Sequence, residues 1–299
     1  MITRTTSQTM ARNAQQNLQA NMSRLSKLQE QVSSSSAITR PSDNPTGTAD
    51  ALKVRAEIRA NTQHSTNIGD ADGWLSTVDA ALSTTSDLLN RIRDLAMRGA
   101  SGGLSQLNKD AIASELDGLN QDLLRAANTT FAGRSVFAGN SNGPAFTADP
   151  AGVEDKYAFT GTENGSVMRQ IAAGAPVRVD ADGAAVFGAG PSSVFALVDT
   201  VAAGLREGTD ISVHLGRIEK HADTILANRT DVGIRHASVL KAKDTNLSNS
   251  VSLEARRSGI EDLDTAQVIL DMKLQEVAYQ AALSVTARVL QPTLMDFLR

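Results

Sequence analysis

The chain has 299 residues, of which 41% are hydrophobic and 3% are aromatic, a formal charge of −4 at neutral pH, and no cysteine. This length can supply the cores of two or three domains, but the slightly negative charge argues against a nucleic-acid partner, because a nucleic-acid-binding face must neutralise phosphates. Without cysteine there can be no disulfide or cysteine-based zinc site, and without a run of about 18 apolar residues no membrane-spanning helix is expected.

The first predicted element is a helix from about residue 9 to residue 32. One narrow stripe of this helix is apolar, at intervals of three and four residues, and its other faces are rich in Gln, Asn and Ser. A single helix with such a stripe buries too little surface to offset its conformational entropy, so it needs a partner helix. The stripe consists of Leu18, Met22, Leu25, Leu28 and Val32.

A second helix is predicted to start at residue 45. The sequence RPSDNP at residues 40–45 contains two prolines that interrupt the first helix, Asn44 can cap the next helix, and Pro45 suits its first position. The pattern stays helical to about residue 98, and residues 75–96 form a heptad seam with one polar position, Thr85.

A third helix over about residues 104–128, antiparallel to the second, is the simplest interpretation of the next segment. From about residue 129 to residue 193 the heptads disappear, and short alternating runs bounded by glycine and proline predict strands. Residues 157–160 and 166–171 flank an Asn-Gly pair, and an Asp-Gly pair follows at residues 182–183; both dipeptides are typical of hairpins. We therefore expect a small β-rich domain between two helical halves.

The last hundred residues are predicted to be helical and carry the most regular repeat in the chain. Residues seven apart from Ile218 to Ala281 are apolar, except for Asn246 and Gln267. About 80 residues of continuous helix would span roughly 120 Å, so an elongated molecule is expected. Near the C-terminus a second heptad position joins the seam, which there consists of Ile260, Leu263, Gln267, Leu270, Leu274, Val277, Ala281 and Ser284.

Both ends of the chain thus carry apolar stripes that have no nearby partner, and the economical solution pairs the two ends. The expected fold class is mainly α, an elongated helical bundle or coiled coil built from both termini, with a smaller β-rich inserted domain. The expected domains are an N-terminal helix (1–44), a helical bundle made of residues 45–130 and 194–259, a β-rich insert (131–193) and a C-terminal helix (260–299).

No catalytic, cofactor-binding or metal-binding constellation is recognisable, and an enzyme is not expected. The sequence has no G-x-x-x-x-G-K-[ST] phosphate loop and no H-E-x-x-H pair. His214 and His221 lie seven residues apart on a helix, but the spacing supplies no third metal ligand, so we interpret both as solvated surface.

Two further clusters also have a structural interpretation. An acidic group beside Leu263 is interpreted as the solvent-exposed side of a coiled coil, and three aromatic residues are interpreted as plugs of the core at domain junctions rather than as a ligand platform. The acidic group is Glu261, Asp262 and Asp264, and the aromatic residues are Trp74, Phe131 and Phe137.

Several stretches resemble the flagellin superfamily of axial flagellar proteins. Residues 40–47 (RPSDNPTG) are similar to the R-x-P-S-D-D-P block of the hook-associated protein 3 family, where flagellins tend to carry a version rich in lysine, aspartate and alanine. Residues 131–139 (FAGRSVFAG) resemble the family's junction between helical and β domains, residues 229–235 its turn before the final helices, and residues 279–298 its C-terminal end. Pro292 departs from the pattern, and it should kink or end the last helix.

The resemblance implies a structural subunit that joins hook to filament by self-assembly into a ring or helical layer, with hook-associated protein 1 and flagellin as neighbours. It also implies secretion to the extracellular flagellum by type III export, without a cleaved signal peptide, after a chaperone has held the C-terminal helix. The first residues contain no apolar signal-peptide region, as this route requires. The implied assembly residues on the terminal helices are Leu18, Met22, Leu25, Leu28, Val32, Leu263, Leu270, Leu274, Val277 and Ala281.

Two other functions are compatible with the same sequence. The chain could be a short flagellin, the filament subunit itself, or a cytosolic coiled-coil adaptor with no flagellar link. The phenotype of a gene deletion distinguishes a junction protein from a flagellin. Detection of the protein in sheared extracellular appendages would eliminate the cytosolic adaptor.

Overall fold

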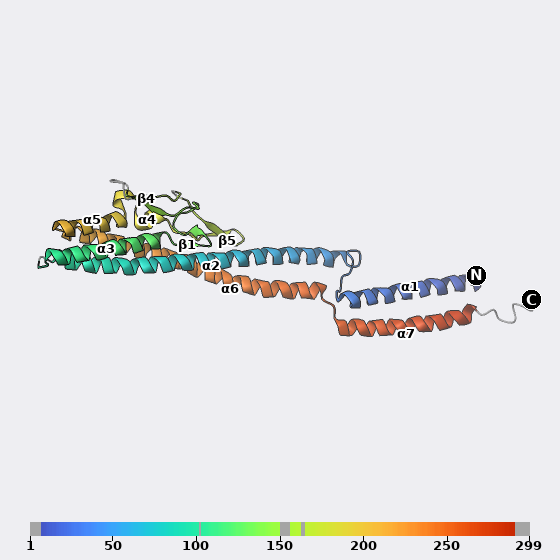
Figure 1. The fold of residues 1–299 in the computed structure, drawn as a ribbon. Coiled ribbons are helices and arrows are strands. Elements are labelled where there is room, and N and C mark those ends of the chain that lie inside the picture. The colour runs from blue at the N-terminus through green and yellow to red at the C-terminus, as the bar shows by residue number, and fades with distance from the viewer. Residues whose placement is uncertain (1–6, 102, 150–155, 163–164, 291–299) are drawn as a thin grey trace, which may run out of the picture. The chain divides into compact units, whose positions relative to one another are not determined.

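A computed structural model describes residues 7–101, 103–149, 156–162 and 165–290 (Figure 1). As expected, the described chain is mainly helical, with a small strand-containing region between the helical parts. It divides into a terminal unit, drawn from residues 1–60 and 250–299, and a middle unit, residues 61–249. Pro292 and its predicted kink lie outside the described residues.

The two ends of the chain pair within the terminal unit. Helix α1 (Ser7–Ser34) packs beside helix α7 (Thr265–Leu290) (Figure 1). The helices run antiparallel, because Asn21 contacts Gln275 whereas Ser36, farther along the chain, pairs with Asp262. The expectation that the two ends of the chain pair with each other is confirmed.

Helix α2 (Pro45–Ala100) begins where the sequence predicts. The Asn44 side chain accepts a hydrogen bond from the Gly47 backbone N–H at 2.9 Å, so it caps the helix. A Cβ atom at residue 47 would lie 2.5 Å from Asn44 Nδ2, so a larger residue there would displace the capping side chain.

Four helices form the framework of the middle unit: parts of α2 and α6 (Ser212–Glu261), with α3 (Gln106–Ala127) and α5 (Val194–Glu207). Helices α3 and α5 pack against each other; the separate helix α5 was not anticipated. The predicted heptad positions of α6 enter the hydrophobic core together with the α2 seam, which confirms this part of the pattern. The buried α6 positions are Ile218, Ile225, Val232 and Val239, and those of α2 include Leu75, Val78, Leu82, Leu89 and Ile92.

The polar heptad positions of α2 and α6 form hydrogen bonds within this pair of helices. The Asn246 amide donates to the Asn61 carbonyl oxygen at 2.9 Å and to its side-chain oxygen at 2.8 Å, and Asn61 Nδ2 donates back to the Asn246 carbonyl oxygen at 3.2 Å. Thr85 is buried, and its hydroxyl donates to the Ala81 carbonyl oxygen at 2.8 Å. These bonds remove the cost of burying polar groups.

Within the described residues the strands form three antiparallel pairs. The pairs are β1 (Thr130–Phe131) with β2 (Arg134–Ser135), β3 (Phe146–Ala148) with β4 (Tyr157–Phe159), and β5 (Met168–Ala172) with β6 (Ala175–Arg178).

The predicted hairpin between residues 157–160 and 166–171 is wrong, because β4 pairs with β3 and β5 pairs with β6. The β5–β6 hairpin instead turns at Gly174, whose positive φ of 71° favours glycine. The Asp-Gly pair also forms no hairpin: Asp182 caps the short helix α4 (Gly183–Phe187), which the 3₁₀ turn η1 (Gly190–Ser192) follows.

Aromatic rings fill the space between the strands and helix α5. The Phe146 ring lies 5.1 Å from Phe195 and 5.7 Å from Phe187, measured between centroids, and Phe195 lies 5.4 Å from Tyr157. Burial and the Asp199 carboxylate raise the pKa of the Tyr157 phenol to about 12. This cluster couples the strand region to the helices of the middle unit.

Asp72 should make the middle unit sensitive to acid. Hydrogen bonds from His236 and Lys243 lower the pKa of the Asp72 carboxyl below its ordinary value of 3.8. Because the folded pKa is depressed, this stabilisation is present above about pH 3.8 and is lost as the pH falls through the lower, folded value. We expect urea unfolding between pH 5 and pH 2 to be less pH-dependent in Asp72→Asn than in the wild type. Asp244→Asn, at an exposed position of α6, is the matched control.

Candidate assembly surface of the terminal helices

The stripe predicted on α1 mostly faces α7. Leu18, Leu25, Leu28 and Val32 are half-buried, whereas Met22 is 60% exposed. The seam therefore uses four of the five predicted α1 residues, and Met22 stays on the outside.

The seam of α7 differs from the predicted one. The predicted continuous helix is interrupted at residues 262–264, and α7 begins after this linker, capped by Asp264, whose carboxylate accepts from the Gln267 N–H at 3.1 Å. Because the linker residues do not follow helical rotation, the positions that become half-buried lie one or two residues later than the predicted ones. They include Val268, Met272, Gln275, Tyr279 and Ala282.

A polar contact fixes the register of the α1–α7 seam. Gln275 Nε2 lies 3.3 Å from the Asn21 carbonyl oxygen and 3.2 Å from its side-chain oxygen. Beside this contact, an open groove of about 550 Å³ is lined from α1 by Arg24, Lys27, Leu28 and Gln31 and from α7 by Asp271, Leu274, Gln275 and Ala278.

The predicted α7 residues instead form an exposed apolar face, which we call the outer stripe: Leu270, Leu274, Val277 and Ala281. Leu270 is 55%, Leu274 62% and Val277 64% exposed, and Ala281 is also exposed. Leu263, in the linker, is half-buried. Helix α7 is therefore apolar on two faces, only one of which packs against α1.

The terminal unit has little core of its own. Of its side chains that the structure describes, the only buried hydrophobic ones are Ala51 and Val54, both on α2. The paired terminal helices thus contribute few of the contacts that stabilise an isolated chain.

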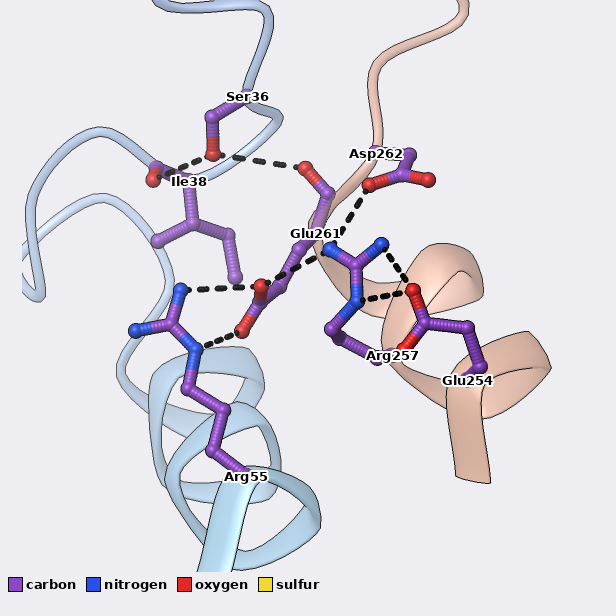
Figure 2. A network of polar contacts seen from close by, with 7 residues as sticks. All are labelled: Ser36, Ile38, Arg55, Glu254, Arg257, Glu261 and Asp262. Carbon is purple, nitrogen blue, oxygen red and sulfur yellow. Dashed lines mark hydrogen bonds and ion pairs between the residues drawn. The ribbon is translucent and has the colours of Figure 1, made fainter. Parts of the chain in front are cut away.

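The acidic group interpreted as solvated surface is only partly exposed. Asp262 and Asp264 are exposed, but Glu261 is 8% exposed and forms an ion pair with Arg55 of α2 (Figure 2). The interpretation is wrong for Glu261 because its charge is compensated by a residue 206 positions away in the chain, which no local pattern reveals.

His214 and His221 are half-buried rather than solvated. Burial, and then the charges of Arg217 and Lys220, lower the pKa of His221. Across the described ranges, no three His, Cys, Asp or Glu side chains gather closely enough to hold a metal ion.

The aromatic residues pack as predicted. Trp74 and Phe137 are buried, and the ring of Phe131, which is half-buried, lies 5.7 Å from the Trp74 ring in an edge-to-face arrangement. These three residues belong to the packing of the middle unit.

Comparison with known proteins agrees with this architecture. Residues 6–142 match the family model of the bacterial flagellin N-terminal helical region, and residues 215–298 match that of the bacterial flagellin C-terminal helical region. No helix in the described part of the chain combines the length and apolar character that a membrane crossing requires.

Individual relatives cover different parts of the chain. A flagellin of Clostridium tyrobutyricum is 34% identical over 121 residues, which is 40% of this chain and 32% of that protein, so less than two thirds of that relative is matched. Flagellar hook-associated protein 3 of Salmonella typhimurium is 22% identical over 282 residues, covering 86% of this chain and 87% of the relative.

The fold also matches solved structures. A putative flagellar hook-associated protein from Vibrio parahaemolyticus superposes with a TM-score of 0.67 at 19% sequence identity, covering 74% of this chain and all of that one. The two family matches, one at each end of the sequence, cover the helices that pair in the terminal unit and helices α2, α3 and most of α6. The chain belongs to the flagellin family of axial flagellar proteins.

Proposed function

We propose that this protein is a non-enzymatic structural subunit of the flagellum that joins the hook to the filament. The observation that carries the proposal is the outer stripe of α7, in which Leu270, Leu274 and Val277 are exposed beside a completed α1–α7 seam. A monomer gains nothing from exposing these side chains to water, whereas a neighbouring subunit could bury them. The nearly full-length match to a hook-associated protein 3 supports the junction as the place of assembly.

The assembly would use unlike surfaces on successive subunits. A contact between two different faces does not close a dimer and produces rings or open helical layers. We propose that the outer stripe, together with Met22 on α1, forms one such face, and that hook-associated protein 1 and flagellin are the neighbours on the two sides of the layer. The predicted assembly residues that lie in the α1–α7 seam would act indirectly, by holding the two helices together.

Export through the flagellar type III channel is the delivery route that we propose, with a chaperone on the C-terminal helix before export. The exposed apolar face of α7 supports this part of the proposal, because a cytosolic chain with such a face needs protection from aggregation. In the assembled state the protein would lie outside the cell.

A deletion of the gene tests the proposal against its rivals. For a junction protein we expect intact hooks without filaments and flagellin released into the medium, with filaments restored by the full-length chain. If the chain is instead the filament subunit, its deletion removes this flagellin itself, so none is released into the medium. Normal filaments in the deletion strain would reject both flagellar functions and favour an adaptor.

Removal of residues 1–32, or of residues 263–299, should leave a soluble, folded monomer that cannot assemble. Apart from Ala51 and Val54, the buried hydrophobic side chains of the described chain lie in the middle unit, so their packing does not depend on the terminal helices. Thermal unfolding followed by circular dichroism should show a midpoint close to that of the full chain. Loss of the cooperative transition would contradict this prediction.

A further inference from the structure

Glu261, the last residue of α6, combines two roles at the start of the α6–α7 linker. Its carboxylate is buried, which is unfavourable for a charge unless the charge is paired. Arg55 supplies this pairing: its Nη2 donates to Oε2 at 2.9 Å, and its Nε lies 2.7 Å from Oε1 (Figure 2). Arg257 Nη1 lies 3.5 Å from Oε2. The side chain thus ties the end of α6 to the first turns of α2.

The backbone of the same residue holds the other linker. The Glu261 carbonyl oxygen accepts from the Ala37 N–H at 2.8 Å, and Ser36 Oγ lies 3.4 Å from it. Ser36 and Asp262 form an antiparallel bridge. The α1–α2 linker and the α6–α7 linker therefore run side by side and are joined at Glu261.

Neighbouring contacts hold each linker in its path. Gln31 Nε2 donates to the Ala37 carbonyl oxygen at 2.9 Å, and Arg257 bridges Glu254 at 2.8 Å and Asp262 at 3.3 Å. Ser35, at the end of α1, has a positive φ of 52°, a conformation that residues other than glycine rarely adopt. Such a sharp turn persists only where surrounding contacts fix the chain.

We infer that Glu261 is a positioning residue for assembly: the Arg55–Glu261 pair holds the two linkers together and thereby fixes the path by which the α1–α7 pair leaves α2 and α6 within the terminal unit. This inference rests on the proposed function, because its consequence is the presentation of the outer stripe to a neighbour. Without the pair, the backbone contacts of Ala37 and Ser36 alone would join the linkers, and the stripe would be presented in a broader range of orientations. Binding would then have to select one of them, which weakens the contact in proportion to the population of the competent orientation.

The geometric part of the inference can be measured in the full-length chain without any assembly. Because the sequence contains no cysteine, Lys53→Cys on α2 and Gln280→Cys on α7, both at exposed positions, can carry two spin labels. Electron–electron distance measurements should give one narrow distribution in the wild type and lose it in Glu261→Gln, which keeps the shape of the side chain but removes its charge. An unchanged narrow distribution would overturn the inference.

A matched control separates this effect from the general loss of an ion pair. Glu57→Gln removes the ion pair between Glu57 of α2 and Arg256 of α6, in which Arg256 Nη1 lies 3.1 Å from Glu57 Oε2. This variant should keep the narrow distribution. If both variants broaden it equally, Glu261 has no special positioning role.

Assembly supplies the functional test. Glu261→Gln should lose incorporation into flagella, while its thermal midpoint stays at that of the wild type. Adding Ser36→Cys and Asp262→Cys to this variant should restore incorporation when the disulfide is formed and not when it is reduced, because these residues already face each other across the bridge. Failure of the oxidised variant would overturn the inference. If the wild type itself does not assemble at hooks, the proposed function fails, but the distance measurement still decides the role of Glu261.

Discussion

Replacing Leu270, Leu274 and Val277 together by glutamine is expected to abolish incorporation into flagella and to leave the thermal unfolding of the isolated chain unchanged. These side chains are 55%, 62% and 64% exposed, so the monomer gains little from their packing. Burying an apolar side chain of this size in an interface contributes about 1.5 kcal/mol or more. Because more than a third of each side chain is already covered, the three together amount to at least about 3 kcal/mol, which is roughly a hundredfold in affinity. Incorporation can be scored by electron microscopy and by the protein content of sheared flagella.

The matched control for this triple variant changes exposed apolar residues elsewhere. Leu107→Gln with Val213→Gln alters side chains that are 79% and 69% exposed on α3 and α6. This control should assemble like the wild type. Normal assembly of the triple variant would show that the outer stripe is not a subunit contact, and a lowered melting temperature would show that it packs within the monomer.

Phe195→Ala is expected to destabilise the middle unit by about 3–5 kcal/mol. The Phe195 ring is fully buried and lies 5.1 Å from Phe146, 5.4 Å from Tyr157 and 5.7 Å from Phe187, so its removal leaves a cavity among rings that cannot collapse easily. For a unit of this size the loss corresponds to a fall in melting temperature of roughly 10 °C. Urea unfolding followed by near-ultraviolet circular dichroism measures the effect.

Phe195→Leu keeps most of the side-chain volume and should cost much less than the alanine variant. Similar losses in both variants would indicate that the aromatic contacts, rather than the filled volume, stabilise the cluster. A loss below about 1 kcal/mol for Phe195→Ala would contradict the packing described here.

The helices could be predicted from the sequence because their periodicity is local. The seven-residue spacing of Ile218, Ile225, Val232 and Val239 predicts the buried face of α6, and all four side chains are buried. The cap at Asn44 was equally visible, since the capping residue and the amide that it binds are neighbours in the chain. The pairing of the two ends followed from stripes that had no closer partner.

The break between α6 and α7 had a local signal that the heptad pattern obscured. Asp264 followed three residues later by Gln267 is a typical start of a helix, and Asp264 does cap α7. Because the apolar spacing continued across residues 262–264, the seam was expected on the face that contains Leu270 and Leu274. A continuous repeat therefore does not establish a continuous helix.

The strand pairing and the partner of Glu261 had no local signal. The partner of a strand depends on contacts between segments, and β4 lies beside β3 although an Asn-Gly pair follows β4. Arg55 and Glu261 meet only after α2 and α6 have packed. Charges of this kind look like ordinary surface residues in the sequence, and only their burial distinguishes them.

The reciprocal amide hydrogen bonds between Asn61 and Asn246 fix how α2 and α6 align, and this bears on the uniformity of the subunits. If α2 slipped along α6 by one heptad, each amide would face an aliphatic neighbour and lose its partner. Folding therefore has one favoured alignment even though the apolar repeat alone would tolerate several. Every folded copy therefore has the same dimensions, which a repeating array of subunits requires.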